Sequence, residues 1–67
     1  MKEKVSYIIS KGNEYLVAIA YTDSKTPRWS TSAWDAVRII WYQDAQRVAD
    51  AVGGKILKFS NLKGVLG

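Results

Sequence analysis

Neither cysteine nor histidine occurs among the 67 residues of this chain. Disulfide bridges, thiolate sites and histidine metal ligands are therefore excluded, and with them the cross-links that often stabilise domains of this size. The fold must come from apolar packing alone, for which a hydrophobic fraction of 48% is sufficient. A chain this short has room for one sheet covered by one helical layer, so we expect a single domain over residues 1–67.

The first third of the chain carries the patterns of two antiparallel strands. Residues 4–10 alternate apolar and polar side chains except at Ile8, which is typical of a strand with one buried face. Residues 14–21 are apolar on both faces, so we expect this strand to be central in its sheet. Gly12 and Asn13 lie between the two strands and tolerate positive φ, which predicts a tight hairpin.

Residues 32–52 allow two interpretations, a single helix or a strand followed by a helix. The single helix would cover residues 33–52 and begin after Ser32, which forms a capping-box pattern with Asp35. The alternative places a strand at residues 37–42, which are the densest β-branched and aromatic run in the chain. We prefer the strand followed by a helix.

In the preferred interpretation, a short helix follows at about residues 43–53. Its apolar side chains recur with helical spacing, and Gly53 suits the left-handed position that ends a helix. A last strand is expected at residues 55–60, and residues 61–67 are expected to form a frayed tail. The chain is thus predicted to be a small α+β domain of order β-β-β-α-β, with an antiparallel sheet and the helix packed on one face through Ala45, Val48, Ala49 and Val52.

Several segments resemble a group of small proteins encoded by bacterial phages and prophages. The similar features are the N-terminal hairpin, a tryptophan-bearing loop, and the segments DAVRI at 35–39, AQRVA at 45–49 and GGKI at 53–56. Trp41 and Tyr42 depart from the pattern, because such proteins usually carry Thr or Ser before the helix. The resemblance implies a phage accessory protein that binds and inhibits a host factor; anti-CRISPR proteins are one class of similar size.

The sequence contains no catalytic motif. The five glycines are too scattered to form a phosphate-binding loop, and the six carboxylates are spread along the chain rather than paired. Without histidine or cysteine, the usual nucleophile–base pairs are absent. We therefore expect a non-enzymatic protein that uses no cofactor and no metal.

The three tryptophans are the most informative candidates for a binding site. Trp41 lies in an apolar run and is expected in the core, whereas Trp29 follows Pro27 in the polar stretch at residues 22–32 and is expected to be exposed. An exposed tryptophan beside arginine is typical of a protein–protein hot spot. We therefore predict a protein as partner, contacted through Lys25, Arg28, Trp29 and Trp34. The resemblance to phage proteins implies that this partner is a host protein.

A net charge of +4 leaves a second function open. No acid follows Asp50, so the C-terminal end of the chain is basic. Nucleic acid or an acidic surface could be contacted by Arg38, Lys55 and Lys58, together with an aromatic on the sheet. Acids are interleaved with the basic residues through the middle of the chain, which disfavours nucleic acid. A third hypothesis is a structural homodimer formed through an exposed apolar strand, so the chain is expected to be a monomer or a homodimer.

The expected location is the cytoplasm, which is the host cytoplasm if the protein is phage-encoded. No apolar run approaches the roughly 18 residues of a membrane span, and residues 1–4 lack the apolar core of a signal peptide. We therefore expect no contact with a membrane.

Overall fold

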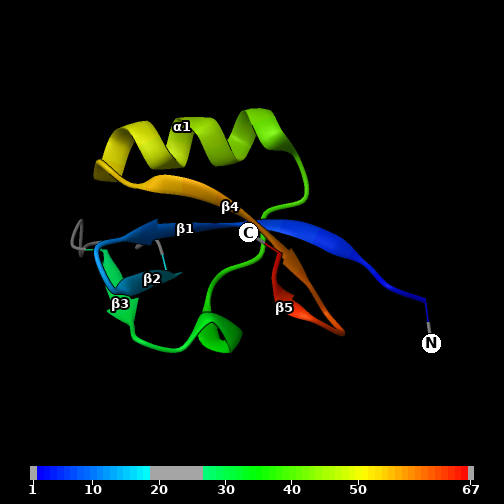
Figure 1. Cartoon of the computed structure of the whole chain (residues 1–67). Helices are drawn as coiled ribbons and strands as arrows, with labels where there is room; N and C mark the ends of the chain where they lie inside the picture. Colours follow the sequence, from blue (N-terminus) through cyan, green and yellow to red (C-terminus); the bar gives the residue numbers. More distant parts are fainter. Residues whose placement is uncertain (1, 19–26, 67) are drawn as a thin grey trace.

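The computed structural model describes residues 2–18 and 27–66 of the chain. These residues form one α-helix packed on a five-stranded antiparallel sheet, with a short 3₁₀-helix before it (Figure 1). In chain order the elements are β1 (Val5–Lys11), β2 (Glu14–Ala18), β3 (Arg28–Ser30), η1 (Ala33–Asp35), α1 (Tyr42–Val52), β4 (Lys55–Ser60) and β5 (Gly64–Val65). The strands lie in the order β3-β2-β1-β4-β5. The predicted α+β class, with strands before and after a single helix, is confirmed.

β1 is the middle strand and is buried on both faces. Ile8 and Ile9 are adjacent in the chain and both fully buried, and neighbouring residues of a strand point to opposite faces. Each isoleucine therefore belongs to a different apolar cluster. Ile9 packs under α1 with Leu16, Ala45 and Ala49. Ile8 packs on the other face with Ala36 and Phe59.

The prediction that residues 14–21 form the central strand is only partly correct. β2 is an inner strand, paired with β1 on one side and β3 on the other, but the middle position belongs to β1. Residues 19–21 lie outside the described residues. Ile8, which broke the alternation in the first strand, was the sequence signal that β1 is buried on both faces.

The predicted hairpin joins β1 and β2 and also contacts the end of the helix. Lys11 pairs with Glu14, and Gly12 has a φ of 62° while Asn13 keeps a negative φ, which is the pattern of a type II′ turn. The Lys11 Nζ then donates a 3.1 Å hydrogen bond to the carbonyl of Val52 in the last turn of α1. Carbonyls there lack helical partners and carry partial negative charge, so the lysine stabilises the helix end.

Residues 37–42 do not form the predicted strand. Ile39 makes one isolated bridge to Tyr7, in which the two backbones exchange hydrogen bonds of 2.7 and 2.8 Å. Val37 donates to the carbonyl of Leu16 at 2.9 Å, so this segment crosses from β2 to β1. The third strand is instead β3, within the stretch predicted to be a loop.

The alternative of one helix over residues 33–52 is also wrong. Only Ala33–Asp35 is helical in the first half of that range, and α1 begins at Tyr42. The predicted helix at about residues 43–53 is confirmed, and it ends at Gly53 with a φ of 73°. Its predicted core face is confirmed as well: Ala45 and Ala49 are buried, and Val48 and Val52 pack against them.

Part of the tail predicted to be frayed is paired. Within residues 61–67, β5 pairs with β4 through Val65 opposite Phe59 and Gly64 opposite Ser60. The Leu66 N–H continues this pairing with a 2.9 Å hydrogen bond to the carbonyl of Lys58. The paired tail closes the sheet on the side away from β3.

Gly54, at the turn between α1 and β4, lies too close to β1 to carry a side chain. A Cβ there would stand 2.7 Å from Ile9 Cγ2 and 2.8 Å from the Ser10 carbonyl oxygen. Gly54→Ala should therefore lower the free energy of unfolding by about 1–3 kcal/mol, measured by urea denaturation. Gly12→Ala is the control, because its Cβ would meet open space and only the strain of positive φ, about 1 kcal/mol, remains. A Gly54→Ala variant as stable as the wild type would contradict the close packing at Gly54.

Candidate interaction groove

A groove of about 590 Å³ opens where the start of β1 faces the segment that precedes α1. Its walls come from three parts of the chain: the N-terminal strand, the segment at residues 38–40 and the residue that follows β4. The lining side chains are two cations, two aliphatic residues and two small polar residues: Lys4, Arg38, Val5, Ile40, Ser6 and Asn61. We call these six residues the interaction groove. They combine apolar surface with positive charge.

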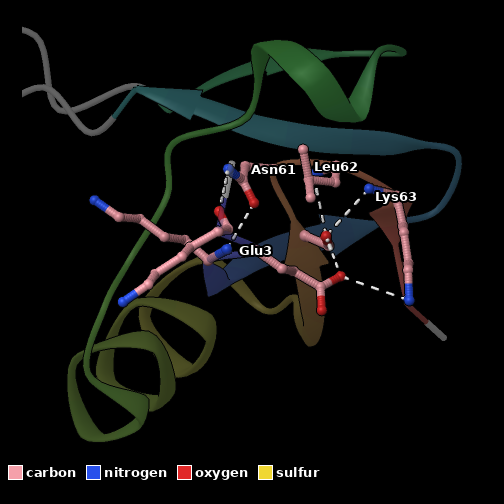
Figure 2. Close-up of polar contacts among 7 residues, drawn as sticks. Glu3, Asn61, Leu62 and Lys63 are labelled. Atoms are coloured by element: carbon pink, nitrogen blue, oxygen red, sulfur yellow. Dashed lines mark hydrogen bonds and ion pairs between the residues drawn. The ribbon is translucent and has the colours of Figure 1, made fainter.

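Asn61 holds the N-terminal wall of the groove (Figure 2). Its Oδ1 accepts a 2.6 Å hydrogen bond from the backbone N–H of Lys4, and its own N–H donates to the carbonyl of Lys4 at 3.1 Å. The Nδ2 of Asn61 also donates to the carbonyl of Lys2 at 3.4 Å. The side chain thus acts as a strand partner for the residues before β1, and Lys4 has a fixed backbone position.

Ser60, beside Asn61, is a fully buried polar residue whose hydroxyl has three partners. It donates to Glu3 Oε2 at 2.7 Å and accepts from the N–H groups of Leu62 and Lys63, both at 3.1 Å. Figure 2 shows Glu3 reaching toward this turn from the N-terminal segment. The Lys63 ammonium lies 3.8 Å from the same carboxylate oxygen. The hydroxyl therefore joins the N-terminal segment to the turn between β4 and β5.

Arg38 is held on the opposite wall by an aromatic contact. Its guanidinium carbon lies 4.9 Å from the centre of the Phe59 ring, and the Trp34 ring meets the same phenylalanine edge-on at 5.0 Å. The bridge at Ile39 fixes the backbone between Arg38 and Ile40, whose side chains point away from that of Ile39 because the segment is extended. The guanidinium is thus placed at the groove by Phe59 while remaining exposed.

A run of three large apolar residues continues from the groove to the first turn of α1. Ile40, Trp41 and Tyr42 are 73%, 70% and 52% exposed. Trp41 and Tyr42 also line a second, shallow hollow of about 550 Å³ together with Gln43 and Asp44. The Tyr42 ring contacts Tyr7 edge-on at 5.3 Å, which anchors this end of the run to the sheet. Contiguous exposed apolar residues of this kind are typical of interaction sites.

Neither cation of the groove is neutralised within the described part of the chain. Residues 2–18 and 27–66 form one ion pair among themselves, between Lys63 and Glu3. Lys4 and Arg38 have no carboxylate within ion-pair distance in those ranges, and no acid lines the groove. Both positive charges are therefore available to an approaching molecule.

The predicted environments of two tryptophans are wrong. Trp29, expected to be exposed in a loop, lies in β3, is half-buried and packs against the cluster under α1. Lys11 Nζ lies 5.9 Å from its ring centre. Trp41, expected in the core, is 70% exposed. The β-strand inferred for residues 37–42 would have buried Trp41, and the loop inferred for residues 22–32 left Trp29 without a strand partner.

The remaining predicted site residues do not form one site, although two of them contact the same ring. Trp34 and Arg38, assigned to different functions by the sequence, both contact Phe59 and lie together. Arg28 is exposed on the edge strand β3, and Lys25 lies outside the described residues. Lys55 and Lys58 are exposed on β4, outside the lining of the groove. Of the predicted residues, Arg38 lines the groove.

Sequence reasoning missed the other five lining residues. Lys4, Val5 and Ser6 were assigned to a strand, and Asn61 to a frayed tail, so they were not considered as one surface. The separation of Lys4 and Asn61 by 57 positions gives no local pattern. Ile40 lies in an apolar run that was assigned to a strand, so its exposure had no signal in the sequence.

The described residues contain no cluster of three or more His, Cys, Asp or Glu side chains suited to a metal ion. None of the helices in the described ranges has the length and apolar character needed to cross a membrane. No protein family, curated protein or solved structure matches the chain. The resemblance to phage-encoded proteins therefore stays a prediction.

Ser60→Ala should destabilise the domain, because two backbone N–H groups and the Glu3 carboxylate would lose their shared partner. The expected loss of unfolding free energy is about 1–3 kcal/mol, measured by chemical denaturation. Glu3→Gln is the matched control: it keeps an acceptor for the hydroxyl and removes only the exposed ion pair with Lys63, for a loss below about 1 kcal/mol. If Ser60→Ala left the free energy of unfolding unchanged, the hydroxyl would not hold the turn.

Proposed function

We propose that this chain is a non-enzymatic binding domain that engages another protein through the interaction groove and the adjoining residues 40–42. The observation that carries the proposal is the exposure of Ile40, Trp41 and Tyr42 at 73%, 70% and 52%. A small soluble domain gains no folding energy from such residues, whereas a protein interface buries aromatic and aliphatic anchors at its centre.

The surroundings of these residues support a protein as partner over nucleic acid. Val5 and Ile40 offer aliphatic surface, which does not stack on bases as aromatic rings do. Trp41 and Tyr42 could stack, but Asp44 shares their hollow and its carboxylate would repel a phosphate backbone. Of the three basic residues predicted to contact nucleic acid or an acidic surface, Arg38 lines the groove, whereas Lys55 and Lys58 lie outside it.

The biological role that fits a small binding domain without chemistry is modulation of the partner. A domain of this size can block a surface of a larger protein, as the phage accessory and anti-CRISPR-like hypothesis requires. This role rests on the resemblance of the sequence, and the binding surface supports it only by offering an apolar and positively charged contact area.

Trp41→Ala and Trp29→Ala should have opposite effects. Trp41 is 70% exposed, so its removal should change the free energy of unfolding by less than about 0.5 kcal/mol but weaken partner binding by about 2 kcal/mol or more. Trp29 packs against the core, so its removal should cost about 2–3 kcal/mol of stability. Thermal denaturation and titration calorimetry on both variants measure the two quantities. If Trp29→Ala weakened partner binding and Trp41→Ala did not, the partner would contact Trp29 and Arg28, as the sequence predicted.

Capture from a host lysate tests whether the surface is used at all. Immobilised wild type should retain a protein that the Ile40→Ser, Trp41→Ser double variant does not retain, while a Leu62→Ser control, which alters an exposed apolar residue outside the groove, should retain it. Nuclease treatment should leave the captured protein in place. Sedimentation of the wild type at rising concentration examines the homodimer hypothesis, which predicts a dimer that the double variant abolishes.

A further inference from the structure

We infer that the interaction groove takes a short acidic segment of the partner protein in which carboxylate side chains alternate with aliphatic ones. This inference rests on the proposed function and specifies the chemistry of the partner. The groove has two kinds of surface that such a segment would satisfy together. Val5 and Ile40 provide exposed aliphatic surface, and Lys4 and Arg38 provide positive charge beside it.

The two cationic residues of the groove are each held by a neighbouring side chain. The guanidinium carbon of Arg38 lies 4.9 Å from the centre of the Phe59 ring, which Trp34 contacts edge-on, and this cation–π contact favours the observed position of the guanidinium. The backbone of Lys4 is fixed between two hydrogen bonds to Asn61. A guanidinium held in this way loses less entropy on binding and can donate two parallel hydrogen bonds to a carboxylate.

Charge complementarity selects the acidic occupant. The groove lining carries two positive charges and no negative one, and no carboxylate of the described residues lies within ion-pair distance of either cation. A basic segment would be repelled by Lys4 and Arg38. A neutral aliphatic segment would cover the guanidinium without giving it a partner, which costs desolvation energy.

The groove differs from the surface that phosphate or a lipid headgroup would require. Its lining includes the aliphatic side chains of Val5 and Ile40, which a free phosphate would leave without an apolar partner. Nucleic acid would also have to approach Asp44, which lies in the neighbouring hollow with Trp41 and Tyr42. An anionic membrane remains a distinct ligand class, and vesicles form a separate arm of the experiment.

The test uses a fluorescein-labelled peptide of alternating glutamate and leucine, with two matched peptides in which lysine or glutamine replaces glutamate. Fluorescence anisotropy should show binding of the glutamate peptide, weaker binding of the glutamine peptide and none of the lysine peptide. Binding should weaken as salt rises. Arg38→Met keeps an unbranched apolar side chain over Phe59 and removes the charge, so it should weaken the glutamate peptide about tenfold.

Arg47→Met is the matched control, because it removes an equally exposed cation from α1 outside the groove and should leave peptide binding unchanged. Ile40→Ser should weaken the binding of the glutamate peptide and of the glutamine peptide by similar factors. Circular dichroism on each variant confirms that the fold is retained. Equal binding of all three peptides, or equal losses for Arg38→Met and Arg47→Met, would overturn the inference.

Two further arms separate this inference from the proposed function. Tighter binding to phosphatidylserine vesicles or to single-stranded oligothymidine than to the glutamate peptide, lost in Arg38→Met, would overturn the acidic segment as occupant. If no peptide binds while the Ile40→Ser, Trp41→Ser variant still loses the partner captured from lysate, the inference fails and the proposed function stands. If that variant keeps its partner, the proposed function fails.

Discussion

The burial of two adjacent isoleucines on opposite faces of β1 determines the architecture of this domain. Ile8 and Ile9 can both be buried only if each face of the middle strand is covered. α1 covers the face of Ile9, and the segment around η1 covers the opposite face (Figure 1). On that face Ala36 packs with Ile8 and with Phe59 of β4. A chain without disulfides is thereby stabilised by two small clusters that share one strand.

The covering of the second face creates the candidate site. The chain between η1 and α1 must cross from one face of the sheet to the other, and its bridge from Ile39 to Tyr7 fixes it beside β1. The side chains that flank this bridge cannot share the environment of Ile39, so Arg38 and Ile40 are exposed. The groove is thus a consequence of how the chain reaches α1.

Sequence reasoning predicted the features that depend on local pattern. It failed for features that depend on pairing between distant segments. The hairpin at Gly12, the helix face at Ala45 and Ala49 and the stop at Gly53 all follow from short-range rules, and all are present. Trp41 lies in an apolar run that local pattern cannot distinguish from a core strand; it is exposed because the pairing of this run with β1 stops at the single bridge of Ile39 to Tyr7. The groove combines residues from both ends of the chain, so no local pattern reveals it.

The contact between Lys4 and Asn61 links residues 57 positions apart, nearly the full length of the described chain. Such a contact closes late in folding, since the entropy of a long loop must be overcome before it forms. In a partly folded chain the groove is therefore incomplete, because its N-terminal wall is missing until both ends have met. A partner that selects the groove would bind only the completed fold and would shift the folding equilibrium toward it by mass action.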